Sequence, residues 1–99
     1  MEIIEIIKEF KKDILTILKD KLDRVILFGS YARGDYDEES DVDILILVKE
    51  MPTLKEKEKI IKIASRYSLK YDILISPIIY KKTIRTSFID EVESYGIEI

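Results

Sequence analysis

Asp41 and Asp43 have the residue type and the spacing of a metal-binding pair. Both acids open an aliphatic run that ends at Val48, and a two-residue offset on a strand points both carboxylates to the same face. Two like charges side by side repel each other unless a cation or a shared proton compensates them. A hard divalent cation does this best, and Mg²⁺ prefers one or two protein carboxylates together with water and substrate phosphates. Mn²⁺ would accept the same oxygen ligands.

Gly29 and Ser30 follow an apolar run and have the composition of a phosphate-binding turn. Glycine lets the backbone approach a ligand closely, and amide N–H groups at a strand-to-turn junction can form an anion-binding nest. Taken alone, the Gly-Ser dipeptide also fits a plain turn. Arg33 is the only cation between Arg24 and Lys49, and beside such a nest we interpret it as a phosphate clamp.

Asp72 is the third candidate ligand. It lies near the start of a run that we expect to be a strand, residues 71–75. If that strand neighbours the one with Asp41 and Asp43, the three carboxylates form a triad, about the minimum for two-metal phosphoryl transfer. The alternative is that Asp72 only caps the rim of its strand. The acids from Asp35 to Glu39 are interpreted as a solvated loop.

The composition excludes several classes of chemistry. The chain has 99 residues, no Cys and no His, so it has no disulfides, no zinc–thiolate site, no thiol nucleophile and no imidazole base. Its net charge of −3 argues against direct nucleic-acid binding as its main role. No apolar run is long enough for a membrane span, and the N-terminus does not resemble a signal peptide, so we expect a cytoplasmic protein. Residues 1–99 are expected to form one domain.

The hydrophobic pattern predicts the elements that hold these residues. A helix is expected from Glu2 to about Asp23, because its apolar residues recur every three or four positions. A second helix, opened by a capping box at Thr53, is expected to reach about Leu69. Strands are expected at residues 24–28, 41–48 and 71–75, the last of these stopped by Ser76-Pro77.

Two further segments complete the prediction. Residues 31–40 are expected to form a loop, with a short helical turn opening at Ser30. A short helix through Phe88 and Tyr95 is expected to be closed by Gly96 in a left-handed conformation, before an edge strand at residues 97–99. The result is an α/β (α+β) fold of order α-β-β-α-β-α, a small mixed sheet with helices packed on one face. Its first two strands are expected to be antiparallel, because about a dozen residues leave no room for a crossover helix.

The joint pattern resembles a known family. Gly29-Ser30, ten intervening residues, then Asp41-Val42-Asp43, with Asp72 further on, are similar to the DNA polymerase beta nucleotidyltransferase superfamily. The segments 28–34 and 40–44 resemble its minimal nucleotidyltransferase (MNT) group more closely. The resemblance covers essentially the whole chain and implies the nucleotidyltransferase fold.

The resemblance also implies a function. The donor would be ATP or another nucleoside triphosphate, with Asp41 and Asp43 binding two Mg²⁺ ions. Asp72 would bind the catalytic ion and help to deprotonate the acceptor hydroxyl, while Ser30 and the Gly29 backbone would hold the terminal phosphates near Arg33. MNT proteins are typically paired with HEPN-family toxins, and as antitoxins they transfer AMP to a toxin tyrosine.

Three functions remain open from the sequence. The first is transfer of AMP to a HEPN partner, the second is a non-catalytic antitoxin that neutralises its partner by binding, and the third is a small-molecule nucleotidyltransferase. A chain with one core has no second lobe to enclose base and acceptor. We therefore expect a partner protein or a second copy of the chain to complete the acceptor side.

Overall fold

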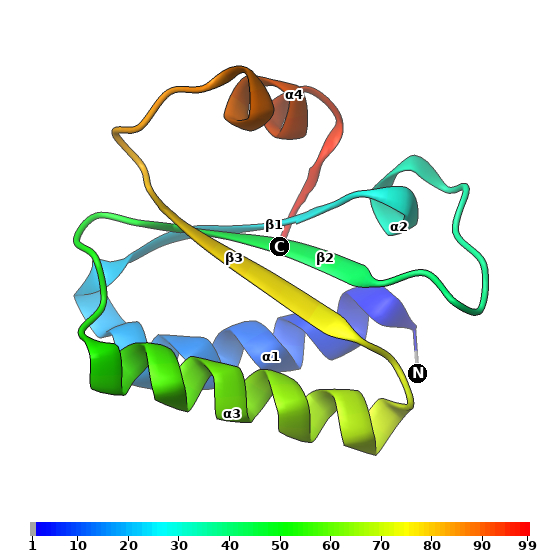
Figure 1. The fold of residues 1–99 in the computed structure, drawn as a ribbon, viewed down its shortest axis with the longest axis horizontal. Helices are drawn as coiled ribbons and strands as arrows, with labels where there is room; N and C mark the ends of the chain where they lie inside the picture. Colours follow the sequence, from blue (N-terminus) through cyan, green and yellow to red (C-terminus); the bar gives the residue numbers. More distant parts are fainter. Residues whose placement is uncertain (1) are drawn as a thin grey trace.

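A computed structural model describes residues 2–99. Over these residues, four helices and four strands alternate, with one short 3₁₀ turn at Lys19–Lys21 (Figure 1). The helices are α1 (Ile3–Leu18), α2 (Ser30–Arg33), α3 (Leu54–Tyr71) and α4 (Ser87–Tyr95). The strands are β1 (Leu22–Phe28), β2 (Val42–Val48), β3 (Ile75–Lys81) and β4 (Ile97–Glu98).

The strands form one mixed sheet in the order β3-β2-β1-β4. β1 pairs antiparallel with β2 on one side and with β4 on the other. β2 and β3 are parallel, because the 18-residue helix α3 returns the chain to the end of the sheet from which β2 started. The predicted fold class, the antiparallel first pair and the final edge strand are confirmed.

The helices cover both faces of the sheet, so the expectation that they all pack on one face is wrong. α1 and α3 lie on one face, and α4 lies alone on the other (Figure 1). Alternate residues of β2 divide between the two layers: Val42, Ile44, Ile46 and Val48 join the larger cluster, and Leu45 and Leu47 join the smaller. The last helix must therefore bury Ile89 and Val92 on the second face.

The two long helices begin largely as predicted and end elsewhere. α1 stops at Leu18, where Lys19 has a positive φ of 51°, and not at Asp23. The capping box of α3 is confirmed: the Glu56 N–H donates to Thr53 Oγ1 at 3.1 Å, and the Thr53 N–H donates to Glu56 Oε1 at 2.8 Å. No helix within residues 2–99 is both long enough and apolar enough to cross a bilayer.

The predicted third strand is displaced along the chain. Residues 71–75 were expected to form it, but α3 continues to Tyr71, and β3 runs from Ile75 to Lys81 with Pro77 inside it. β3 is an edge strand, where a residue without an N–H group is tolerated because one side of the strand has no ladder partner. Pro77 is therefore not the stop signal that its residue type suggests.

Gly96 also differs from its predicted role. Its φ is −64°, so it does not close α4 in a left-handed conformation. A Cβ at this position would lie 2.5 Å from Ile26 Cγ2 and 2.6 Å from the Val92 carbonyl oxygen. Glycine is required here because the chain passes directly over β1 as it enters β4.

Candidate active site

The candidate site lies where β1 ends beside the start of β2. The antiparallel register places Phe28 opposite Asp43, so Gly29 and Ser30 follow β1 at the edge of the sheet from which Asp41 enters β2. Asp43 alternates with Leu45 and Leu47, so its side chain lies on the α4 face of the sheet. The sequence therefore brings together Gly29, Ser30, Asp41 and Asp43, as predicted.

Gly29 is in direct contact with the Asp43 carboxylate. Its φ is +72° and its ψ is −156°, a backbone conformation that is essentially restricted to glycine, and a Cβ built on it would overlap Asp43 Oδ2. No side chain can occupy that space while the carboxylate keeps its place. The glycine is thus explained by the close approach of an acid as well as by the turn.

The Asp43 carboxyl is in an electrostatically unfavourable position. Burial raises its pKa, the neighbouring Asp41 carboxylate raises it further, and the Arg33 guanidinium lowers it only in part. A second cation beside the pair would relieve this repulsion. Two hard oxygen ligands, one half-buried and one exposed, fit Mg²⁺, which completes its shell with water and substrate phosphates.

The turn after β1 is a short hydrogen-bonded helix, as expected at Ser30. The N–H groups of Ala32 and Arg33 both donate to the Gly29 carbonyl at 3.1 Å, and the Gly34 N–H donates to the Ser30 carbonyl at 2.9 Å. These bonds hold the backbone of the Gly-Ser turn in a defined conformation. Arg33 is exposed, and its Nε lies 3.4 Å from Asp35 Oδ2.

Asp72 is not gathered with the other two acids. It is the residue that ends α3, in a left-handed conformation with φ 53°, and it lies three residues before β3 begins. Within residues 2–99 no group of three or more Asp, Glu, His or Cys side chains is placed to hold a metal ion. The neighbour of Asp43 across the β2–β3 pair is Ser76. The predicted three-carboxylate cluster is thus reduced to Asp41 and Asp43.

Comparison with known families and proteins agrees with this geometry. The nucleotidyltransferase domain family matches residues 3–99. The chain belongs to this family. A Methanocaldococcus jannaschii protein named "putative protein adenylyltransferase" is 93% identical to it over 99 residues, 100% of both chains.

Solved structures support the same nucleotidyltransferase fold. An MntA–HpeT toxin–antitoxin mutant has a TM-score of 0.67 at 20% identity, over 99% of this chain and 72% of that one. A "putative minimal nucleotidyltransferase" has a TM-score of 0.64 at 21% identity, over 100% and 97% of the two chains. A tri-AMPylated Shewanella oneidensis HEPN toxin in complex with MNT antitoxin gives 0.55 at 20% identity, over 92% and 69%. At these identities the likeness establishes the fold.

Tyr95 contacts two residues of the candidate site, and the sequence did not select it. The Gly29 N–H donates to its hydroxyl oxygen at 3.1 Å, and Arg33 Nη1 lies 3.5 Å from the same oxygen. Nothing in the sequence distinguishes Tyr95 from the five other tyrosines, because 66 residues separate it from Gly29. The only available signal was its position at the end of the final helix, directly before Gly96.

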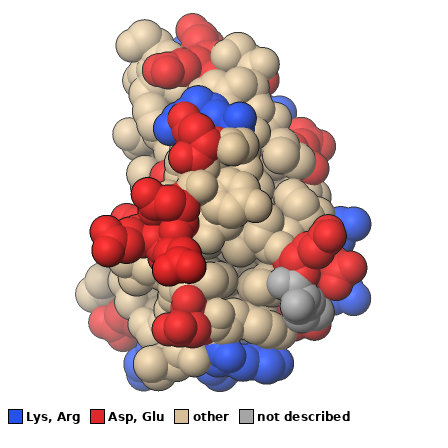
Figure 2. Space-filling view, turned by 90° about the vertical axis from the view of Figure 1, so that its right-hand side faces the viewer, with Lys and Arg blue, Asp and Glu red and all other residues tan. Residues whose placement is uncertain are grey.

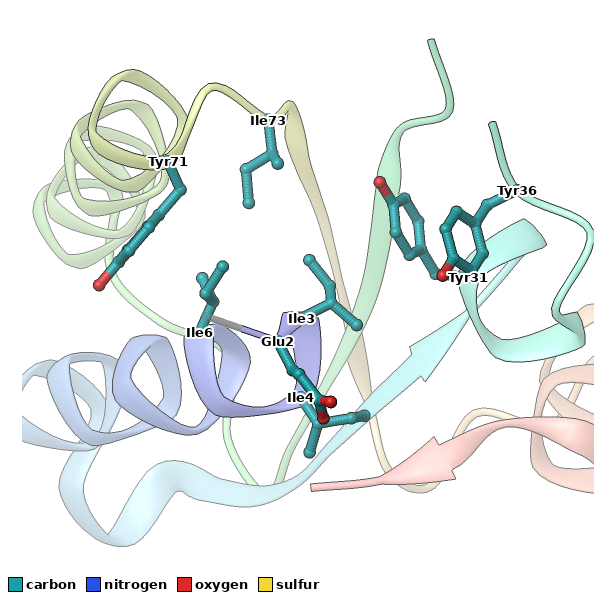
Figure 3. Close-up of a pocket in the computed structure, with 8 residues that line it drawn as sticks. All are labelled: Glu2, Ile3, Ile4, Ile6, Tyr31, Tyr36, Tyr71 and Ile73. Atoms are coloured by element: carbon teal, nitrogen blue, oxygen red, sulfur yellow. The ribbon is translucent and has the colours of Figure 1, made fainter. Parts of the chain in front are cut away.

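Two cavities lie away from the carboxylate pair. One of about 600 Å³ is lined mainly by apolar and aromatic side chains (Figure 3). The stacked rings of Tyr31 and Tyr36, whose centroids are 4.3 Å apart, form one side of it. The other, of about 610 Å³, includes Asp72 and Glu38. Of the predicted site residues, only Asp72 lines one of these two cavities.

The acidic loop between α2 and β2 is solvated, as predicted. Asp35, Asp37, Glu38 and Glu39 are all exposed. The loop is closed by its own polar groups, since the Glu39 N–H and the Ser40 hydroxyl both donate to Asp37 Oδ1. Acidic side chains gather on this side of the molecule (Figure 2). Asp41, which directly follows this loop, is exposed beside it.

Proposed function

We propose that this nucleotidyltransferase transfers AMP from ATP to a tyrosine hydroxyl of a HEPN-family toxin and so acts as its antitoxin. The observation that carries the proposal is the Asp41–Asp43 pair, with the Asp43 carboxylate held against Gly29. The relative named as a protein adenylyltransferase supports AMP transfer to a protein. The structural relative with a tri-AMPylated HEPN toxin supports the class of partner.

The transfer needs one bond to form and one to break. The acceptor hydroxyl oxygen attacks the α-phosphorus of ATP, the bond from that phosphorus to the oxygen bridging the β-phosphate breaks, and pyrophosphate leaves. The hydroxyl proton passes to solvent. Mg²⁺, when bound, neutralises the charge that develops on the phosphate oxygens.

The residues of the chain bind and orient the donor. Asp41 and Asp43 supply the carboxylate oxygens for the metal ion, which is the role that their mutual repulsion fits. Ser30 and the backbone of the Gly29 turn would hold the terminal phosphates. Arg33, which lies beside Asp35 at 3.4 Å, would exchange that exposed carboxylate for a phosphate oxygen.

Asp72 has no part in this proposal. Its predicted role as metal ligand and base required Asp72 to lie in the strand beside β2. The structure places it at the end of α3 instead, before that strand begins. The acceptor tyrosine must then be oriented by the partner protein.

The proposal is tested with the purified chain, a HEPN-family protein encoded by the neighbouring gene, ATP and Mg²⁺. We expect the intact mass of the HEPN protein to increase by one or more AMP units, and the increase to disappear with Asp41→Asn/Asp43→Asn. Asp37→Asn, an exposed acid of the same loop, is the matched control and should leave the adduct in place. An unmodified HEPN protein, or an adduct that persists in the double variant, would overturn the proposal.

The single variant Asp43→Asn separates catalysis from neutralisation by binding alone. In cells that express the HEPN protein, we expect the wild-type chain to restore growth and Asp43→Asn to fail. Restored growth with Asp43→Asn would favour the non-catalytic antitoxin. Adenylylation of small hydroxyl compounds by the isolated chain would favour the small-molecule enzyme.

A further inference from the structure

We propose that Tyr95 is a positioning residue of the donor site, whose hydroxyl fixes the Gly29 turn and holds Arg33 toward the triphosphate of ATP. This inference rests on the proposed function, because it assigns the ligand of the turn as the donor nucleotide. It concerns a residue near the C-terminal end of the described chain that lies outside the sequence motif.

The contacts of Tyr95 join the two parts of the motif turn. Its hydroxyl oxygen accepts the Gly29 N–H at 3.1 Å and faces Arg33 Nη1 at 3.5 Å. The Arg33 guanidinium carbon also lies 5.7 Å from the centroid of the Tyr95 ring, within the range of a cation–π contact. One side chain thus contacts both the backbone and the cation of the predicted phosphate site.

The chemistry of the phenol allows a third contact. In both interactions the oxygen is the acceptor, so its own O–H remains available as a donor. A phosphate oxygen bound at the Gly29–Ser30 turn is a suitable acceptor for it. Tyr95 would then act on the donor directly as well as through Arg33.

Two side chains contact the Arg33 guanidinium, Asp35 from the loop and Tyr95 from α4. Asp35, in the exposed loop, lies 3.4 Å from Arg33 Nε, whereas the Tyr95 hydroxyl lies 3.5 Å from Arg33 Nη1. If the Tyr95 hydroxyl is removed, Asp35 remains as the only polar side chain bonded to Arg33 among the described residues. The guanidinium would then be held by the loop rather than beside the turn.

Tyr95 is carried by an element that is fixed on both sides. α4 buries Ile89 and Val92 against β1 and β2, and the Phe88 ring packs edge-on against Phe28 at 5.5 Å. Directly after Tyr95, Gly96 passes within van der Waals contact of β1.

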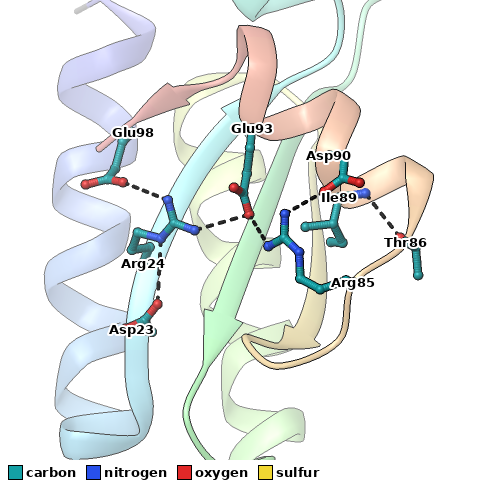
Figure 4. A network of polar contacts seen from close by, with 8 residues as sticks. All are labelled: Asp23, Arg24, Arg85, Thr86, Ile89, Asp90, Glu93 and Glu98. Atoms are coloured by element: carbon teal, nitrogen blue, oxygen red, sulfur yellow. Dashed lines mark hydrogen bonds and ion pairs between the residues drawn. The ribbon is translucent and has the colours of Figure 1, made fainter.

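Ion pairs further along α4 hold its outer side. Glu93 lies between Arg24 of β1, at 3.3 Å, and Arg85, at 2.8 Å (Figure 4). Arg85 also pairs with Asp90, and Arg24 with Glu98 of β4. The Tyr95 hydroxyl therefore reaches Gly29 from a rigid support, as a positioning group must.

The test compares Tyr95→Phe with Tyr80→Phe. Both rings lie in the α4 layer, and Tyr80 packs edge-on against Phe88 at 5.9 Å, but among the described residues its hydroxyl has no hydrogen-bond partner. For Tyr95→Phe we expect the affinity for AMP-PNP with Mg²⁺ to fall about 5- to 10-fold and the KM for ATP to rise by the same factor. The KM for the HEPN acceptor should be unchanged, and the melting temperature should fall by only a few degrees, because the part-buried Gly29 N–H loses its acceptor. Tyr80→Phe should match the wild type in all four.

Three outcomes would overturn the inference: unchanged AMP-PNP affinity in Tyr95→Phe, an equal loss in Tyr80→Phe, or a fall in kcat and stability without a change in nucleotide affinity. The binding measurement does not depend on AMP transfer. If the wild type binds AMP-PNP in a Tyr95-dependent way but modifies no HEPN protein, the inference stands and the proposed function fails.

Discussion

Asp43 and Glu93 are two carboxylates of the same layer that meet opposite environments. Glu93 accepts hydrogen bonds from Arg85 and Arg24, which lower its pKa. Burial and the neighbouring Asp41 carboxylate raise the pKa of Asp43, and the Arg33 guanidinium lowers it only in part. The acid that is satisfied by the protein fastens α4 to the sheet. The acid that is left unsatisfied is the one that we propose binds a metal ion.

The largest expected effect comes from neutralising the unsatisfied acid. Asp43→Asn should lower the rate of AMP transfer by about 10³-fold or more, because it removes the proposed metal ligand. The same change should raise the free energy of unfolding near neutral pH by about 0.5 kcal/mol, because it removes the repulsion with Asp41. Single-turnover assays and urea denaturation measure the two quantities. A loss of activity accompanied by a loss of stability would contradict the comparison.

Gly29→Ala should have the next largest effect, on stability. The new methyl group would overlap Asp43 Oδ2, and φ +72° is unfavourable for alanine, so we expect a loss of about 2 to 4 kcal/mol in urea denaturation. Gly34→Ala is the matched control: its φ is +88°, but nothing lies within 4 Å of the added Cβ. It should cost only about 1 kcal/mol.

The double variant Gly29→Ala/Asp43→Ala isolates the contact between the two residues. Without the carboxylate, Gly29→Ala should cost less than it does in the wild type. A cost above that of Gly34→Ala should remain, because Gly29 (φ +72°, ψ −156°) has a conformation that alanine adopts less readily than that of Gly34 (φ +88°, ψ 6°). If the cost of Gly29→Ala is the same with and without Asp43, the glycine is required for its backbone conformation alone.

A smaller effect is expected from Glu93→Gln. It should leave AMP transfer unchanged and reduce the free energy of unfolding by about 0.5 kcal/mol near neutral pH, since its arginine partners are partly exposed. The pKa of Glu93 is lowered from 4.5, so its contribution is present above that value and is lost as the pH falls through the lowered pKa. Urea denaturation across the acid range measures this.

Asp43 should show the opposite pH dependence. Its pKa is raised from 3.8, so the wild type is most stable relative to Asp43→Asn below that value. The advantage of Asp43→Asn should appear as the pH rises through the raised pKa. If the free energies of unfolding of Asp43→Asn and Glu93→Gln, each relative to the wild type, change with pH in the same direction, the two acids do not differ in the way described.

The smallest effect is expected for Asp72→Asn. Asparagine tolerates the left-handed conformation at the end of α3, so the fold should be unaffected. AMP transfer should stay within about twofold of the wild type, in contrast to Asp43→Asn. A loss as large as that of Asp43→Asn would show that Asp72 is a ligand of the site after all, as the family resemblance implies.

Local chemistry explains which parts of the fold were predictable. β1, β2, the capping box at Thr53 and the turn at Gly29 depend on neighbouring residues, and the sequence predicts them. The position of β3 does not follow from local signals, because Pro77 is tolerated only by virtue of the edge position of its strand.

The candidate site divides in the same way. The Asp41–Asp43 pair and the Gly29–Ser30 turn lie in two short segments, and the β1–β2 pairing brings them together. Tyr95 reaches the turn only because α4 folds onto the second face of the sheet. The placement of Asp72 failed because it depended on where a strand begins, and α3 extends two residues beyond its predicted end.

The sheet order has a consequence for hydrogen exchange. β1 and β2 are the two interior strands and are covered by helices on both faces, so their amide protons should exchange only when the whole domain unfolds. Asp43 sits on this most protected pair, and two residues earlier the chain is exposed loop. The backbone that carries Asp43 should therefore be among the most protected of the domain, while the amide protons of the exposed loop before it should exchange much faster.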